Sequence, residues 1–310
     1  MELNKPKFWN SKFSIFSYLL LPLSLLILIY NFLKKRIVRK RKFKIPIVCI
    51  GNIYVGGTGK TPACILIAQE MTKLGKNPVI LKKFYKNQID EQNLIEANYN
   101  NLILNKDRAK GIEQAENNKF DSVILDDGFQ DFKLKTDLNI ICFNSNQLIG
   151  NGFVIPSGPL RESLRSLKNA NLVLINGNKN NDFENKIFEV NDKIKIFYSY
   201  YKPVNLDEFK NKKLLAIAGI GNPENFFRLI ENYKLQIEKK LVFPDHHSFS
   251  KREIQEIIDR AKKEELHIIM TEKDYFKVNK FKIDKVNYLK VSLEILKKNE
   301  FMNIVSKVYD

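Results

Sequence analysis

The sequence predicts an α/β fold built on a mostly parallel sheet, with a second, smaller α/β domain and an apolar helix near the amino terminus. Short apolar runs alternate with polar or helical stretches, as in βαβ units. An Asn-, Lys- and Asp-rich stretch at residues 176–192 separates two such series. The chain has 310 residues and 44% hydrophobic composition, enough for two modest cores. The expected domains are residues 1–44 for the helix and its flank, 45–185 for the larger unit and 186–310 for the smaller unit.

The apolar segment is a run of 21 residues, 13–33, without a formal charge. This is about the length of helix that crosses a hydrocarbon core. Pro22 and the polar residues within the run equally suit a helix that lies in the membrane interface. We therefore expect a membrane-associated helix, with the spanning and the interfacial placements both open.

The flank of this segment, residues 34–44, carries eight Lys or Arg among eleven residues. Such a flank favours the cytoplasmic face and an anionic lipid surface, where each charge contributes at most about 1 kcal/mol. Elsewhere the basic residues alternate with acidic ones and lack an aromatic stacking pattern, so nucleic acid is not an expected partner despite the net charge of +17. The three cysteines are far apart, which indicates a reducing compartment without a disulfide framework. Nothing in the sequence indicates an oligomeric state.

The expected elements follow the flank in order. The larger unit begins with a strand at 45–50, a glycine-rich turn and a helix that ends near Gly75. Further strands are expected at 78–81, 101–104, 122–125 and 138–143. The smaller unit should contain strands at 213–219, 235–243 and 268–271 and a helix at 223–233. Ser250 and Glu253 form a capping box ahead of a second amphipathic helix.

The glycine-rich turn reads GNIYVGGTGKTP at residues 51–62, between a predicted strand and a predicted helix. Such a loop points backbone N–H groups and the positive end of a helix at phosphate oxygens. This order is that of a P-loop NTPase, although the strict motif has glycine where this chain has Tyr54. Lys60 would reach the β- and γ-phosphates of ATP, and the Thr61 hydroxyl would bind Mg²⁺. The expected nucleotide-binding residues are Tyr54, Val55, Gly56, Gly57, Thr58, Gly59, Lys60 and Thr61.

A pair of carboxylates, Asp126 and Asp127, ends the apolar strand at 122–125. A parallel sheet presents a metal-binding acid at this edge, and either aspartate could hold Mg²⁺. A plain turn is the competing interpretation of Asp-Asp-Gly. A GTPase would need a guanine-reading Asn-Lys-x-Asp element, and residues 105–108 end in arginine instead. The sequence therefore favours ATP.

Five motifs in series resemble the tetraacyldisaccharide 4′-kinase family of lipid A biosynthesis. They are GNIYVGGTGKTP, LDDGFQ (125–130), SGPLRE (157–162), FPDHHSF (243–249) and TEKD (271–274). The resemblance runs to about residue 280 and implies a two-domain enzyme with its site in the cleft between the domains. It implies transfer of the γ-phosphate of ATP to the 4′-hydroxyl of an acylated glucosamine disaccharide 1-phosphate, at the cytoplasmic face of a Gram-negative inner membrane.

The resemblance also implies roles for individual residues. Asp90 is the candidate acid that, with His246, activates the sugar hydroxyl, and a positioned base of this kind typically contributes about 10²–10⁴-fold. Arg108 would neutralise the transferring phosphate, with a surface salt bridge as its competing interpretation. A turn before the capped helix is the competing interpretation of His246. The expected metal-site residues are Thr61, Asp126, Asp127 and Glu162.

Two segments depart from the family pattern. Residues 82–86 read KKFYK where Ser-Arg-Gly-Tyr-Gly is expected, which weakens bidentate phosphate binding. Asp131 stands where histidine is expected. One other function class stays open: a membrane-anchored P-loop ATPase that drives a partner, which needs neither Asp90 nor His246. A basic nucleic-acid-binding module would show salt-sensitive binding to DNA or RNA, which we do not expect.

Overall fold

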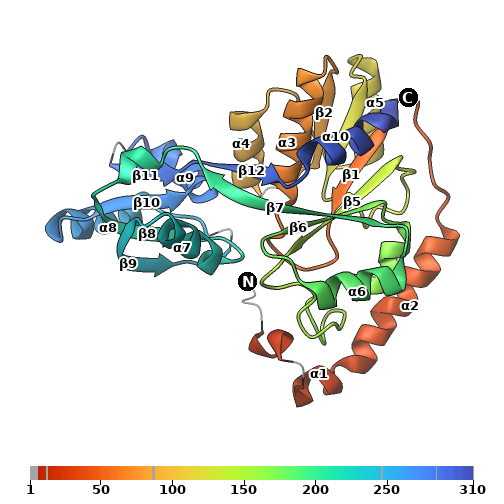
Figure 1. Cartoon of the computed structure of the whole chain (residues 1–310), viewed down its shortest axis with the longest axis horizontal. Coiled ribbons are helices and arrows are strands. Elements are labelled where there is room, and N and C mark those ends of the chain that lie inside the picture. The colour runs from red at the N-terminus through yellow and green to blue at the C-terminus, as the bar shows by residue number, and fades with distance from the viewer. Residues whose placement is uncertain (1–5, 12, 86–87, 246, 284, 310) are drawn as a thin grey trace. The chain divides into compact units, whose positions relative to one another are not determined.

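The computed structural model of the chain describes residues 6–11, 13–85, 88–245, 247–283 and 285–309 (Figure 1). The chain divides into two compact units. The larger unit contains Asn101–Tyr200, the preceding chain up to Phe84 and the chain from Glu294 onward. The smaller unit is formed by Tyr85–Asn100 and Tyr201–Leu293. Each unit is built around a sheet of its own.

The larger unit is built on an eight-stranded sheet with the order β12-β7-β6-β5-β1-β4-β2-β3. From β3 to β7, every pair of neighbouring strands is parallel. β1 and β4 are buried along their whole length, which agrees with their continuous apolar sequence. The strands are β1 (Ile47–Gly51), β2 (Pro78–Lys83), β3 (Leu102–Asn105), β4 (Ser122–Asp126), β5 (Leu138–Asn144), β6 (Leu172–Asn176), β7 (Lys195–Pro203) and β12 (Val291–Ile295).

Helices pack along this sheet and complete the core of the larger unit. Ile112 and Ala115 of α5 join one apolar cluster, and Phe183 and Ile187 of α6 join another. α3 contacts β1, β2 and β4, so the helix that follows the glycine-rich turn lies against the middle of the sheet. The helices are α1 (Ile15–Leu19), α2 (Leu21–Ile37), α3 (Lys60–Lys73), α5 (Arg108–Asn117), α6 (Asn181–Val190) and α10 (Lys298–Ser306), with 3₁₀ turns η1 (Lys7–Asn10), η2 (Leu164–Asn169) and η5 (Lys307–Tyr309).

The smaller unit is built on a four-stranded parallel sheet with the order β11-β10-β8-β9. Alternate residues of β8 enter two apolar clusters, one shared with α7 and the other with α8, as expected for a strand covered on both faces. Its strands are β8 (Lys213–Ala218), β9 (Gln236–Val242), β10 (His267–Thr271) and β11 (Val286–Leu289). Its helices are α4 (Ile89–Asn98), α7 (Pro223–Asn232), α8 (Lys251–Lys263) and α9 (Glu272–Val278), with 3₁₀ turns η3 (Leu206–Phe209) and η4 (Asn279–Phe281).

The α/β architecture with a mostly parallel sheet and a second sheet is confirmed. The capping box of α8 is also present, because the Ser250 side chain accepts from Glu253 N and the Glu253 side chain accepts from Ser250 N. The expected connector at residues 176–192 is wrong, since it contains α6. Asn180 caps this helix by accepting from Phe183 N, and Phe183 and Ile187 are buried one turn apart. The polar residues of the stretch form the exposed face of an amphipathic helix.

The division into units also differs from the expected ranges 45–185 and 186–310. β6 and β7 pair in parallel, which keeps the chain in the larger unit as far as Tyr200. The carboxyl-terminal segment returns to that unit, where Phe301 of α10 packs edge-on against Phe197 with ring centroids 5.2 Å apart. α4 belongs to the smaller unit, where it packs against α9.

The uncharged amino-terminal run forms two helices, because the chain breaks between Leu19 and Leu21 just before Pro22. Within the part of the chain that the structure describes, no helix combines the length and the apolar character needed to cross a bilayer. α2 is fixed to the larger unit through Ser24, whose hydroxyl donates to Val154 O at 2.7 Å and accepts from Ser157 N at 3.1 Å. The amino-terminal helices are therefore part of the folded unit.

Candidate active site

The glycine-rich turn joins β1 to α3 in the order that the sequence predicts. Gly59, with φ of +88°, is the residue before Lys60 at the start of α3, and Gly56 has φ of +109°. These left-handed conformations strain any residue with a side chain, which explains glycine at both positions. The turn therefore places Lys60 and Thr61 in the first turn of α3, with the positive end of the helix dipole beside them.

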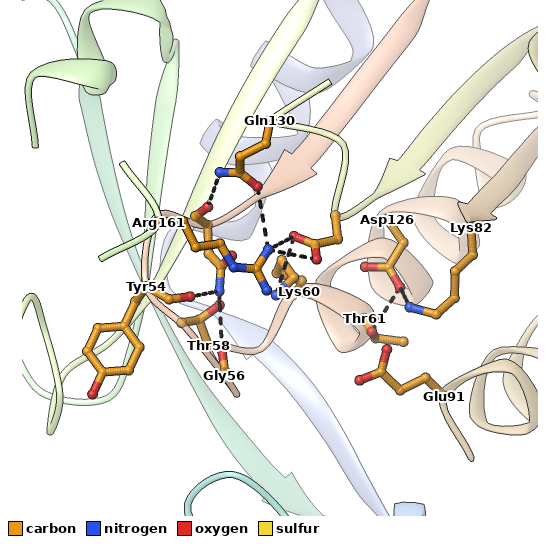
Figure 2. Close-up of polar contacts among 12 residues, drawn as sticks. Tyr54, Gly56, Thr58, Lys60, Thr61, Lys82, Glu91, Asp126, Gln130 and Arg161 are labelled. Carbon is orange, nitrogen blue, oxygen red and sulfur yellow. Dashed lines mark hydrogen bonds and ion pairs between the residues drawn. The ribbon is translucent and has the colours of Figure 1, made fainter. Parts of the chain in front are cut away.

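Asn52, a residue that the sequence analysis missed, holds the shape of this turn. Its buried Nδ2 donates to Tyr54 O at 2.7 Å, to Gly56 O at 3.2 Å and to Thr58 Oγ1 at 3.1 Å (Figure 2). Gln130 Nε2 donates to Asn52 O at 2.8 Å, which links the turn to the segment after β4. The sequence motif does not mark Asn52 as an anchor of the loop, so its role emerged only from the structure.

Tyr54 stands where the strict motif has glycine. Its φ is not positive, and its backbone pairs with Leu160, so glycine is not required there. The phenol ring belongs to the apolar core of the larger unit and points away from Lys60 (Figure 2). Burial raises the pKa of the phenol. Val55 N likewise donates to Pro159 O at 2.9 Å, so Tyr54 and Val55 attach the turn to the SGPLRE segment.

Asp126 lies at the carboxyl end of β4 with its side chain completely buried. Its Oδ2 accepts from Thr61 Oγ1 at 3.0 Å and from Lys82 Nζ at 2.8 Å (Figure 2). Its Oδ1 is buried and has no hydrogen-bond partner among the described residues. Asp126 therefore has one oxygen that is bonded to Thr61 and Lys82 and one that meets no donor among the residues that the structure describes.

Lys82 is the second functional residue that the sequence analysis missed. It stands in β2 directly opposite Asp126, and its side chain is only 4% exposed. The sequence showed only that the expected serine of the family pattern is replaced there by a lysine. Its partner Asp126 lies in β4, which neighbours β2 in the sheet but is distant in sequence. The local sequence around Lys82 therefore could not predict the pair.

We predict that Lys82→Met destabilises the folded protein by about 3–5 kcal/mol, because the substitution leaves the buried Asp126 carboxylate without its cation. Urea unfolding monitored by circular dichroism measures the change. The double variant Lys82→Met/Asp126→Asn should recover most of the loss, since it removes both charges. Lys73→Met is the surface control: Lys73 pairs with Glu70 at 2.7 Å but is 69% exposed, so a change below about 1 kcal/mol is expected. Equal effects of Lys82→Met and Lys73→Met would contradict the prediction.

Asp127 follows with a left-handed backbone, φ +61°. Both of its carboxylate oxygens accept from Arg161 Nη1 at 2.9 Å, and Lys60 Nζ lies 3.6 Å from Oδ1. Burial by itself would raise the pKa of Asp127, but the charges of Lys60 and Arg161 and the hydrogen bonds from Arg161 outweigh it and lower the pKa from 3.8 to about 2. Asp127 is therefore ionised at neutral pH and fixes two cations beside the turn.

Arg108 is held at the same place. Its Nη2 donates to Asp127 O at 2.7 Å, and its Nη1 lies 3.3 Å from Asp131 Oδ2. The Arg108 side chain is only 10% exposed, which excludes the interpretation as a surface salt bridge. Its Nε is buried without a partner among the described residues. Asp131, which replaces the expected histidine, thus acts as a counter-ion for Arg108.

Glu162, at the end of the SGPLRE segment, is 3% exposed. Its Oε2 forms an ion pair with Lys35 of α2, and its Oε1 is buried without a partner in the described part of the chain. Lys35 also lies over the Phe132 ring, 4.6 Å from its centroid. A charge-bearing residue of the basic flank therefore reaches a carboxylate of the expected metal site.

The oxygen ligands offered by Thr61, Asp126 and Glu162 fit Mg²⁺. Mg²⁺ prefers hard oxygen ligands and in kinases is held by one or two carboxylates together with substrate phosphates. Asp126 Oδ1 and Glu162 Oε1, which are buried and have no hydrogen-bond partner in the described part of the chain, are oxygens of this type, and Thr61 Oγ1 lies beside Asp126. Among the described residues, no three His, Cys, Asp or Glu side chains gather into a metal site of their own.

The remaining catalytic candidates belong to the smaller unit. Asp90, in the first turn of α4, is buried, and its Oδ2 lies 3.3 Å from Lys273 Nζ and 3.7 Å from Lys277 Nζ. His246 lies outside the described residues, so its role stays a prediction. Its neighbour His247 stacks on Phe243 with ring centroids 4.8 Å apart.

Comparisons with known proteins agree with the geometry. The family model described as tetraacyldisaccharide-1-P 4′-kinase matches residues 16–310. A protein named tetraacyldisaccharide 4′-kinase from Pelagibacter ubique (strain HTCC1062) is 42% identical over 315 residues, covering 99% of each chain. Its namesake from Rickettsia akari (strain Hartford) is 30% identical over 295 residues, covering 90% of each chain.

Among solved structures, that of LpxK from Aquifex aeolicus in complex with ATP has the same fold. The TM-score is 0.74 at 22% identity, covering 96% of this chain and 100% of that one. The chain belongs to the tetraacyldisaccharide 4′-kinase family.

Proposed function

We propose that this chain transfers the γ-phosphate of ATP to the 4′-hydroxyl of tetraacyldisaccharide 1-phosphate in lipid A biosynthesis. The observation that carries the proposal is the cluster at the start of α3. There, Lys60 lies beside Asp127, and Thr61 is bonded to Asp126, on a glycine-rich turn with two left-handed glycines. Family membership supports the lipid acceptor, and the ATP in the Aquifex aeolicus structure supports the donor.

The larger unit supplies the groups that bind ATP. The backbone N–H groups of the turn and the Lys60 ammonium hold the β- and γ-phosphates, and Arg108 offers a fixed cation for the charge that develops during transfer. Thr61, Asp126 and Glu162 would hold Mg²⁺, which would neutralise phosphate charge when bound. Asp127 keeps Lys60 and Arg161 in place, since it is ionised and contacts both.

The smaller unit supplies the base. Asp90 accepts the proton of the sugar hydroxyl, with His246 as its partner. The sugar oxygen forms its bond to the γ-phosphorus while the bond from that phosphorus to the bridging oxygen of ADP breaks. A sugar hydroxyl is a weak nucleophile, and a positioned base typically contributes about 10²–10⁴-fold.

Transfer of label tests the proposal directly. The wild-type protein is incubated with γ-labelled ATP, Mg²⁺ and detergent-dispersed tetraacyldisaccharide 1-phosphate, with lipid omitted in one control and protein in another. We expect labelled lipid in the complete reaction and no labelled product when either the lipid or the protein is omitted. Hydrolysis of ATP with no labelled lipid would instead support an ATPase that drives a partner.

We propose further that α1 and α2 hold the enzyme on the cytoplasmic face of the inner membrane. Both helices expose large apolar side chains, and the basic residues 34–44 follow directly. Partial burial of these side chains in a lipid interface, together with attraction of the basic flank to anionic headgroups, would place the site beside its acylated substrate. The exposed apolar residues are Phe13, Ile15, Phe16, Tyr18, Leu19, Leu23, Leu25, Leu26, Ile29, Tyr30, Phe32, Leu33 and Ile37.

We predict that the protein floats with phosphatidylglycerol-containing vesicles and that Leu26→Asp/Ile29→Asp weakens this binding at least about tenfold. Burial of one such side chain contributes about 1.5–3 kcal/mol, so the loss of two exceeds that factor. Leu74→Asp is the matched control, because Leu74 is 59% exposed at the far end of α3. Raised salt should also weaken binding, since it screens the basic flank. Equal flotation of both variants would refute this placement.

A further inference from the structure

The TEKD motif, Thr271–Asp274, is not used by the mechanism above, yet every one of its side chains has a defined partner. It spans the end of β10 and the first turn of α9. Thr271 caps α9 by accepting from Asp274 N at 3.1 Å, and its hydroxyl donates to Asp274 Oδ2 at 2.7 Å. Gly219 N donates to the same oxygen at 2.7 Å, which ties the turn to the end of β8. The first and last residues of the motif therefore fix the start of α9.

The two middle residues reach α4, the helix that carries Asp90. Glu272 Oε1 accepts from Asn98 Nδ2 at 3.2 Å, at the carboxyl end of α4. At the other end of α4, Lys273 Nζ lies 3.3 Å from Asp90 Oδ2 and 3.4 Å from Glu91 Oε1. α9 thus holds α4 at both ends.

Lys273 also contacts a third carboxylate, from another part of the chain. Asp245 Oδ1 lies 3.2 Å from Lys273 Nζ, and Asp245 immediately precedes His246. Burial lowers the pKa of Lys273, but Glu91, Asp245 and Asp90 outweigh this and raise the pKa above its ordinary value. The ammonium is therefore charged at neutral pH. Its three N–H donors match three carboxylates from two segments about 150 residues apart in sequence.

We propose that Lys273 is a positioning residue for phosphate transfer: it orients the Asp90 carboxylate and holds Asp245 beside it. Without the Lys273 ammonium, the carboxylates of Asp90, Glu91 and Asp245 would repel one another more strongly, and Lys277, 3.7 Å from Asp90 Oδ2, would remain as a more distant cation. The inference rests on the proposed role of Asp90 as base. A displacement of a reacting group by about 1 Å can cost about 10²-fold in rate, so the effect on turnover should exceed any effect on ATP affinity.

The test compares Lys273→Met, Lys273→Arg and the control Lys263→Met, a lysine exposed on α8 of the same unit. Turnover, KM for the lipid and ATP affinity are measured, with circular dichroism to verify folding. Lys273→Met should lower kcat at least about tenfold and change ATP affinity less than about twofold. Lys273→Arg should retain an intermediate kcat, because it keeps the charge but not the compact ammonium. Lys263→Met should match the wild type.

A double variant separates positioning from a merely structural role. If Lys273 acts through Asp90, Lys273→Met should add little further loss in an Asp90→Asn background. The inference would be overturned if the kcat losses of Lys273→Met and Asp90→Asn multiplied in the double variant. It would also be overturned if Lys273→Met lowered ATP affinity as much as kcat. If Lys273→Met does not fold, Lys273→Arg carries the test, and a wild-type kcat in that variant overturns it.

The experiment also distinguishes this inference from the proposed function. Wild-type turnover in Asp90→Asn would remove Asp90 from the mechanism, whatever Lys273 does. Impaired Asp90→Asn together with fully active Lys273→Met would leave the base in place and reject only the positioning role.

Discussion

Lys60→Ala is expected to abolish label transfer to the lipid, with a fall in turnover of at least about 10³-fold. Removing one preorganised group that stabilises transition-state charge costs about 10²–10³-fold, and Lys60 in addition holds the phosphates in the ground state. It occupies the first position of α3, is 13% exposed and lies 3.6 Å from Asp127 Oδ1, so its ammonium is fixed at the start of the helix. The measurement is the rate at which label passes from γ-labelled ATP to the lipid.

The Lys60 variant should stay folded, which makes the result interpretable. Arg161 still contacts both carboxylate oxygens of Asp127 after Lys60 is removed. Lys73→Ala, at the opposite end of the same helix, is the control for a charge change in α3 and should transfer label normally. Transfer by Lys60→Ala within tenfold of the wild type would reject the phosphate-binding role of the turn.

Asp90→Asn is expected to lower turnover by about 10²–10⁴-fold while ATP affinity stays unchanged. The amide keeps the shape of the carboxylate and can still accept from Lys273, but it cannot take the proton of the sugar hydroxyl. Steady-state transfer with a separate nucleotide-binding measurement separates the two effects. His246→Ala should likewise lower turnover more than nucleotide affinity.

Glu91→Gln is the matched control for Asp90→Asn. Glu91 is the next residue on α4, contacts the same Lys273 ammonium at 3.4 Å and loses the same charge on substitution. A simple electrostatic loss in this cluster would affect both variants equally. A role of Asp90 in proton transfer requires a much larger effect for Asp90→Asn.

The parts of the fold that depend on local sequence could be predicted. The glycine-rich turn, its flanking strand and helix and the capping box of α8 depend on residues within a few positions of one another, and all are present. α6 was missed because its stretch is mostly polar and only Phe183 and Ile187 mark its buried face. Turn chemistry and helix caps are readable in a single sequence, whereas a sparse apolar face is not.

The parts that depend on distant contacts could not be predicted. α4 lies between β2 and β3 in sequence, yet it joins the smaller unit, where Lys273 and Glu272 contact its two ends. Lys82 pairs with Asp126 only because β2 and β4 are neighbours in the sheet. The P-loop lysine and threonine and the Asp126–Asp127 pair lie where the motifs place them, while the supporting residues Asn52 and Lys82 emerged only from the structure.

The ion pair between Lys35 and Glu162 bears on how this protein should be handled. A shortened chain that begins after residue 44 would lose the apolar helices that favour aggregation in water. It would also lose the positive charge beside a deeply buried carboxylate and the Ser24 hydroxyl that bonds to Val154 and Ser157. The amino-terminal helices are thus a structural support of the larger unit, so detergent or lipid nanodiscs suit its purification better than truncation does.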